Sequence, residues 1–198
     1  MKRYFLILFL ALASFASNAQ MHVGVTGGAT FSATAMGSSL KIGWYTGAFV
    51  FYNFNDNLYM NAGAQYARYH TAGNGTDNGY KYKFTELNQF IEVPIHVGYD
   101  FNIINWLDAF VEAGPTVSVG LYGVQSRTYY TSTLDFYVWG DNPIARRVDP
   151  LIGLKAGFKV LKHGEIFGGF DYGILNNCIN GHANTHSKVI RMGLSIWL

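Results

Sequence analysis

The sequence predicts an all-β fold, namely an eight-stranded antiparallel up-and-down transmembrane β-barrel. Residues 106–122 alternate strictly between apolar and polar side chains, for about three times the length of an ordinary strand. Charged residues make up 13% of the chain and aromatic residues 17%, whereas a soluble protein typically has about 25% charged residues. The mature chain has no apolar run near the roughly 20 residues of a helical span. The remaining structure that can hydrogen-bond every backbone N–H and C=O group within the lipid is a closed β-barrel.

The strand at residues 106–122 has two different faces. One face is wholly apolar, and the other carries acids, hydroxyls, glycines and aromatics. A tilted strand needs roughly 9 to 11 residues to cross the hydrocarbon, so a long two-faced strand suits a membrane barrel. The apolar face consists of Leu107, Ala109, Val111, Ala113, Pro115, Val117, Val119 and Leu121, and the other of Asp108, Phe110, Glu112, Gly114, Thr116, Ser118, Gly120 and Tyr122.

The start of the chain predicts export. Residues 1–19 have a basic start, at Lys2 and Arg3, then an apolar run and small residues, which is typical of a cleaved signal peptide. Residues 20–198 are then expected to form a single domain. The mature chain keeps 12 of the 14 Lys and Arg residues against 12 acids, so it is near neutral and nucleic acid is not an expected partner. The lone cysteine, Cys178, excludes an internal disulfide.

The other strands follow from the same alternation, and the connections between them alternate in length. Short turns are expected at 55–57, 100–105 and 162–164, and long polar loops at 33–41, 70–84, 123–149 and 176–188. Short periplasmic turns, long extracellular loops and an even strand number are typical of bacterial outer-membrane barrels. The expected strands span 23–32, 42–54, 58–69, 90–99, 106–122, 151–161, 166–175 and 189–198.

Composition decides which face is the interior. A solvated face would carry Lys and Glu at most positions, whereas the polar face here carries mainly small, hydroxyl and aromatic side chains with a few charges. We therefore expect the polar face to line the lumen and the apolar face to meet lipid. A soluble lipocalin-like barrel, with the opposite polarity, is an alternative.

The charges on the polar face predict a lumen network. One antiparallel register pairs Asp108 with Lys159 and Glu112 with Lys155. A turn at 162–164 would also place Lys155 opposite Asp171. We interpret the network as a plug that holds the barrel in register, because eight strands enclose little more than side chains, and a narrow pore is the alternative. Its expected members are Glu92, His96, Asp108, Glu112, Lys155, Lys159, Asp171 and Arg191.

The loop at 123–149 is rich in aromatic residues and arginine, a composition typical of contact surfaces. Its aromatics would equally suit the interfacial belt of a membrane protein. The candidate contact residues, for a surface protein or ligand, are Arg127, Tyr129, Tyr130, Phe136, Tyr137, Trp139, Arg146 and Arg147.

Catalytic chemistry is the weaker expectation. His182, His186 and Ser187 lie together in the last loop, and some outer-membrane barrels that trim lipopolysaccharide acyl chains use Ser and His near the membrane surface. A solvated polar loop is the preferred interpretation. No metal-ligand spacing stands out, so neither a metal nor a cofactor is expected.

Several short motifs resemble those of a known group. Gly43 and Trp44, the run from Glu92 through Val93 and Pro94 to Ile95, and Ala113, Gly114 and Pro115 are similar to motifs of the PorT-type family of small outer-membrane β-barrel proteins. The leader, which ends in Ala19 and Gln20, also resembles those of that family's hosts. The resemblance implies an integral outer-membrane barrel but names no active site. Such barrels usually end on Phe or Tyr, whereas this chain ends on Trp197 and Leu198.

The sequence therefore predicts a monomeric, non-enzymatic barrel in the outer membrane, in contact with its lipid and lipopolysaccharide. Its role would be structural or a surface contact through the outer loops.

Overall fold

A computed structural model describes residues 21–33, 38–77, 79–130, 132–140, 143–161, 163–177 and 185–198. The expected signal peptide, Cys178 and His182 lie outside these residues. The secondary structure of the described residues consists of β-strands, with no helix. The strands are β1 (Met21–Ala33), β2 (Ser38–Asn53), β3 (Leu58–Asp77), β4 (Tyr80–Ile104), β5 (Leu107–Tyr129), β6 (Ser132–Tyr137), β7 (Val148–Val160), β8 (Gly164–Gly173) and β9 (Lys188–Trp197).

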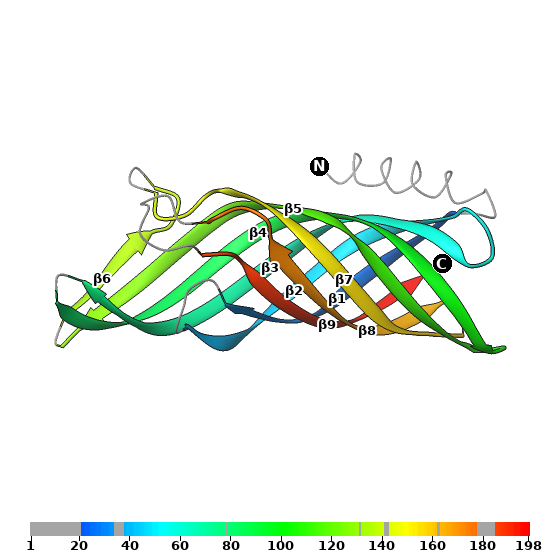
Figure 1. The fold of residues 1–198 in the computed structure, drawn as a ribbon, viewed down its shortest axis with the longest axis horizontal. Coiled ribbons are helices and arrows are strands. Elements are labelled where there is room, and N and C mark those ends of the chain that lie inside the picture. The colour runs from blue at the N-terminus through cyan, green and yellow to red at the C-terminus, as the bar shows by residue number, and fades with distance from the viewer. Residues whose placement is uncertain are drawn as a thin grey trace, which may run out of the picture.

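Eight of the nine strands close into an antiparallel ring. The order around the ring is β1, β2, β3, β4, β5, β7, β8 and β9, and β9 pairs again with β1. Strand β6 pairs with the far end of β5 and extends that strand outward as a hairpin. Figure 1 shows β6 at one end of the elongated barrel and the C-terminus at the other. The expected eight-stranded fold is thus confirmed.

The outer surface of the ring is apolar, as the alternation predicts. Side chains on the outside of β4 and β9 are between 39% and 63% exposed. Near the short turns, aromatic side chains form part of a girdle of the kind found at membrane interfaces. The apolar side chains are Ile91, Val93, Ile95, Val97, Ile190, Met192, Leu194 and Ile196, and the girdle residues are Tyr52, Phe54, Tyr99, Phe101 and Trp106.

The inner surface carries the polar face. Glu92, Glu112, Asp171 and Arg191 are all buried inside the ring. This polarity is the opposite of that of a lipocalin-like barrel, so the soluble alternative has no support. Within the described residues, no helix is long and apolar enough to cross a membrane.

The outer hairpins are longer than the sequence predicts. Residues 70–84, expected to be a loop, continue β3 and β4 in register up to a turn at Gly79, where φ is +83°. Residues 123–129 likewise continue β5, and β6 lies within the expected loop 123–149. In β4 the outward-facing side chains of this part are polar, such as Lys81 and Lys83, and the aromatic ones face inward. The apolar outer face that marks the other strands is therefore absent here.

Two local irregularities also depart from the expected pattern. A bulge in β5 lets Gln89 pair with Tyr122 while Phe90 pairs with Gly120, so Tyr122 points outward instead of into the lumen. At the other end, Leu161 adopts a left-handed conformation with φ +54°. Because β7 therefore ends at Val160, opposite Gly164, the β7–β8 register differs by two residues from the one predicted for a turn at 162–164.

Candidate functional site

The end of the lumen near the short turns is filled by aromatic rings. Phe49, Phe51, Tyr59 and Trp197 form one buried cluster, in which the Phe51 centroid lies 5.3 Å from that of Tyr59 and 5.1 Å from that of Trp197. Lys159 Nζ lies 3.6 Å from the Tyr59 ring centroid and forms an ion pair with Asp100 Oδ2 at 2.8 Å. The Lys159 ammonium is thus buried between aromatic rings and the Asp100 carboxylate at this end of the lumen.

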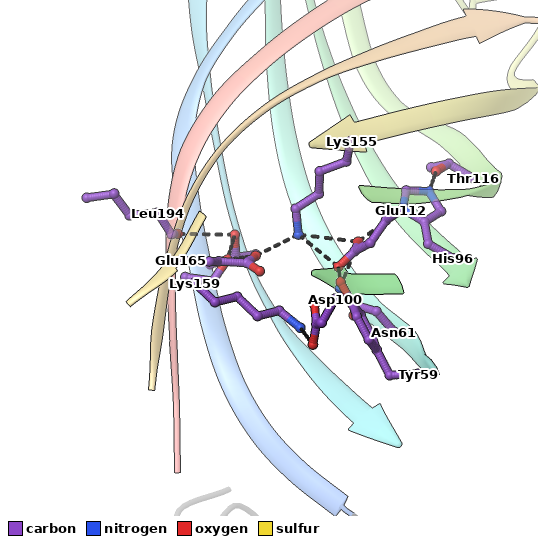
Figure 2. Close-up of polar contacts among 12 residues, drawn as sticks. Tyr59, Asn61, His96, Asp100, Glu112, Thr116, Lys155, Lys159, Glu165 and Leu194 are labelled. Atoms are coloured by element: carbon purple, nitrogen blue, oxygen red, sulfur yellow. Dashed lines mark hydrogen bonds and ion pairs between the residues drawn. The ribbon is translucent and has the colours of Figure 1, made fainter. Parts of the chain in front are cut away.

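The middle of the lumen is organised around Lys155. Its Nζ lies 3.3 Å from Glu112 Oε2 and 2.6 Å from Glu165 Oε1 (Figure 2). Glu112 also accepts a hydrogen bond from the Tyr59 hydroxyl at 2.9 Å. His96 Nδ1 is 3.6 Å from Glu112 Oε2. One lysine thus bridges strands β5 and β8 from its position on β7.

The outer half of the lumen is organised around Arg191. Its guanidinium contacts Glu92 Oε2 at 2.7 Å, Asp171 Oδ2 at 2.5 Å and the Tyr69 oxygen at 2.9 Å. Tyr69 in turn donates to Glu92, which also accepts from Gln65 at 3.1 Å. These hydrogen bonds connect strands on opposite sides of the ring. The burial of the charges is compensated by partners on every side.

The pairing of β5 with β7 follows the prediction. Asp108 lies opposite Lys159 and Glu112 opposite Lys155. The ion pair of Lys159, however, is with Asp100 rather than with Asp108.

The expected approach of Lys155 to Asp171 is wrong. Because of the shifted β7–β8 register, Lys155 lies opposite Gly169 and reaches Glu165 instead, and Asp171 binds Arg191.

Sequence reasoning missed four titratable members of this network. Glu165 lies just outside the expected strand 166–175, although its parity with Asp171 was a usable signal. Asp100 fell in an expected turn. Tyr59 and Tyr69 lie within the expected strand 58–69, but alternation does not show that their hydroxyls donate to buried acids. The missed members are Tyr59, Tyr69, Asp100 and Glu165.

Little empty space remains among the lumen charges. A cavity of about 60 Å³ lies between the Lys155 and Arg191 centres. A buried water needs roughly 10–15 Å³, so this space suits a few waters. Two unpaired buried atoms on its wall, the Tyr45 hydroxyl and Asn61 Oδ1, are natural positions for them.

The loop after β6 folds into the outer mouth of the barrel. Trp139 packs edge-on against Phe90, with ring centroids 5.3 Å apart, and donates from Nε1 to the Arg146 carbonyl at 3.1 Å. A Cβ at Gly120 would lie 2.5 Å from the Trp139 ring, and one at Gly123 would lie 3.0 Å from it. Both glycines therefore make room for the tryptophan.

The same loop is fastened to its neighbours through the backbone. Gly120 N donates to the Arg147 carbonyl at 2.7 Å, and Arg147 Nε donates to the Gly120 carbonyl at 2.9 Å. Arg146 donates from its backbone N and its Nε to the carbonyls of Asn177 and Asn176. Two outer loops are thus joined to each other and to β5.

These contacts separate the candidate contact residues into those that pack against the protein and those that are largely exposed. Arg127 lies over the rings of Tyr82 and Phe136, at 5.1 and 4.7 Å, and the Tyr129 ring is tilted against that of Tyr82, with centroids 5.2 Å apart. Together with Trp139, Arg146 and Arg147, these residues contact the protein itself. Tyr130 and Tyr137 are more exposed, at 95% and 64%, and Tyr137 also lies edge-on to Tyr122 at 6.3 Å.

Under the loop lies a cavity of about 280 Å³, here called the outer chamber. Its wall combines aromatic rings with polar side chains. The lining includes Ser32, Tyr69, Tyr82, Phe84, Glu86, Asn88, Phe90, Gln125, Arg127, Trp139, Asp149, Asn177 and Ser187.

The described part of the His and Ser cluster does not form a nucleophile and base pair. Ser187 Oγ donates to Asp149 Oδ2 at 2.6 Å. His186 instead stacks on Tyr172 at 5.2 Å, and its Nδ1 is 2.8 Å from the Gly173 carbonyl. Among the described residues no group of three or more His, Cys, Asp and Glu side chains is placed to hold a metal ion.

A closed ring with an apolar exterior and a charged, filled interior defines a transmembrane β-barrel. The model of the family described as "Outer membrane protein beta-barrel domain" matches residues 15–178, and the chain belongs to this family. No curated protein matches the chain.

Several solved outer-membrane barrels are similar in fold. Neisserial surface protein A (NspA) shares 13% identity over 89% of this chain and 96% of its own, with a TM-score of 0.45. OprG from Pseudomonas aeruginosa shares 11% identity over 91% and 96%, with a TM-score of 0.48. Ail, the attachment invasion locus protein of Yersinia pestis, shares 11% identity over 90% and 98%, with a TM-score of 0.39.

Proposed function

We propose that the protein is a monomeric, non-conducting and non-enzymatic barrel of the outer membrane that contacts other surface molecules through its outer hairpins. The observation that carries this proposal is the combination of a lumen filled by paired charges with hairpins that continue well beyond the apolar belt. Strand β4 has 25 residues, whereas roughly 9 to 11 suffice to cross the bilayer.

The closed lumen argues for a structural interior rather than a pore. Lys155, Lys159 and Arg191 each bind a carboxylate on another strand, and an aromatic cluster fills the end near the short turns. Ions would have to break these pairs in order to pass. The interior therefore serves stability and register.

The outer hairpins supply the contact surface of the proposal. Tyr80, Tyr130, Leu134 and Tyr137 are large apolar side chains on these hairpins that are more than half exposed. Exposed apolar side chains beyond the membrane are typical of interaction sites. A groove between the two hairpins is bordered by Lys81, Lys83 and the same Tyr130. A surface protein or ligand would bind at this groove, whereas Tyr137, opposite Val124, lies at the end of β6 away from the turn. Lipid and lipopolysaccharide surround the belt.

The geometry of the last loop supports a non-enzymatic role. A serine nucleophile needs a base within hydrogen-bond reach, yet Ser187 donates to Asp149 while His186 packs on Tyr172. The finer assignment to the PorT-type group, and cleavage of residues 1–19, are part of the same proposal.

Planar-bilayer recording tests the closed lumen. Purified protein inserted into a bilayer should give no reproducible conductance steps, because ion pairs and rings occupy the lumen. A stable, uniform step size that scales with salt concentration would refute the non-conducting barrel.

Surface labelling tests the orientation of the hairpins. A membrane-impermeant amine reagent applied to intact cells should modify Lys81 and Lys83, which are exposed on β4, and should spare the buried Lys159. Modification of Lys81 and Lys83 only after cell disruption would place these hairpins on the periplasmic side and remove the contact role.

A further inference from the structure

The outer chamber is surrounded by buried oxygen atoms that lack hydrogen-bond partners among the residues that the structure describes. These atoms are Ser32 Oγ, Asn88 Oδ1, Asp149 Oδ1 and Asn177 Oδ1, and all four residues line this chamber. They are half of the eight such atoms in the described residues. Because buried polar atoms are normally paired, their concentration around one cavity indicates a missing partner.

The two amide groups are oriented by their other contacts. Asn88 Nδ2 donates to Glu86 Oε1 at 2.5 Å. Asn177 Nδ2 donates to Ser187 Oγ at 3.0 Å and to Asp149 Oδ2 at 3.4 Å. Each amide is therefore left with its oxygen unpaired, as a hydrogen-bond acceptor. The two amide oxygens and Asp149 Oδ1 accept hydrogen bonds and cannot donate them, so a ligand must supply the donors.

Asp149 has no ion-pair partner among the described residues, although His186 lies near enough to influence its charge. The residue is 4% exposed, and its hydrogen-bond partners, Ser187 and Asn177, are neutral. No Lys, Arg or His nitrogen lies within the 4.0 Å of an ion pair among the residues that the structure describes. Arg127, the cation on the chamber wall, is held by Gln125 and two aromatic rings. A buried carboxylate without a cation favours a positively charged ligand.

The remaining walls and the volume limit the size and shape of the ligand. Tyr69, Tyr82, Phe84, Phe90 and Trp139 line the chamber with aromatic rings, which attract both cations and C–H surfaces. The volume of about 280 Å³ is close to the lower end of known ligand pockets, about 300 Å³. A single small molecule fits this description.

We propose that the outer chamber binds a small, donor-rich amine, of which an amino sugar is an example. The ammonium group pairs with Asp149, and neighbouring hydroxyl groups donate to Asn88 and Asn177. This site is separate from the groove at the hairpin tips. On its inner side it adjoins the closed lumen through Tyr69, which belongs both to the chamber wall and to the Arg191 network.

Calorimetric titration of the folded, detergent-solubilised protein tests the site with three probes: glucosamine, glucose and inorganic phosphate. Glucosamine and glucose differ at one carbon, by an ammonium group in place of a hydroxyl. Glucosamine should bind about tenfold or more tightly than glucose, since a charged hydrogen bond is about twice as strong as a neutral one. Phosphate should not bind.

The matched variants are Asp149→Asn in the chamber and Asp135→Asn, an exposed carboxylate on β6. Asp149→Asn should abolish the preference for glucosamine, and Asp135→Asn should retain it. If Asp149→Asn does not fold, Gly173→Ala replaces it, because the added Cβ would lie 3.2 Å from Asp149 Oδ1 and narrow the space beside it. The proposal would be overturned if glucosamine did not bind, if glucosamine and glucose bound equally, or if phosphate bound. It would also be overturned if the chamber variant kept the preference for glucosamine.

Discussion

Lys155 shows how a single residue holds this barrel together. Its ammonium lies between two carboxylates from different strands, Glu112 and Glu165, and its side chain is 12% exposed. It also lies 4.2 Å from the Phe167 ring centroid. The lumen contains three such cations, Lys155, Lys159 and Arg191, against five acids that they contact. Each cation is therefore essential for compensating the buried negative charge.

Lys155→Met is expected to destabilise the barrel by about 3–5 kcal/mol, because it keeps the volume but leaves two buried acids without their counterion. Thermal unfolding in detergent micelles, followed by the loss of β-sheet circular dichroism, measures the effect. Lys81→Met, on an exposed part of β4, is the control and should be nearly neutral. An unchanged transition for Lys155→Met would show that the central ion pairs carry no stability.

At the scale of single residues, the sequence predicted which side chains face the lumen more accurately than which of them contact each other. The parity of a strand decides whether a side chain faces inward, and parity is visible in sequence. The partners depend on register and on how far a long side chain reaches. Lys159 accordingly lies opposite Asp108 but binds Asp100, a distinction that alternation does not contain.

At the scale of the strands, the turn after β7 decides which residues of β7 and β8 face each other. Leu161 takes the left-handed conformation, which is uncommon for a residue other than Gly or Asn. The turn therefore begins one residue earlier than its Lys, His and Gly sequence predicts. That difference moves Glu165 into the strand, opposite Lys159, and brings it to Lys155.

Engineered disulfides distinguish the observed register from the predicted one. In a Cys178→Ser background, Ala156→Cys should cross-link readily with Gly168→Cys, its direct neighbour on the outer face. The register expected from sequence would instead place residue 170 opposite Ala156, so the Phe170→Cys combination is the control. Mass spectrometry of non-reduced peptides gives the yields. Preferential cross-linking to position 170 would contradict the observed β7–β8 pairing.

At the scale of the whole molecule, the closed ring satisfies the backbone while the two faces separate lipid from charge. The sequence predicted the strand number of the ring and its polarity, because a membrane barrel requires both. The expected long loop at 70–84 proved to be mostly strand. The sequence did not predict the outer hairpins or the chamber. The chamber depends on contacts between distant loops, such as those of Arg146 with Asn176 and Asn177, and on the space that Gly120 and Gly123 leave for Trp139.

The location and closure of the barrel support every other conclusion. They are tested most directly by fractionating expressing cells and running the envelope fraction on detergent gels with and without boiling. A closed barrel in the outer membrane should remain folded in detergent and migrate faster unboiled, slowing only after boiling. Recovery of the protein in the soluble periplasmic fraction, with the same mobility before and after heating, would contradict a membrane barrel.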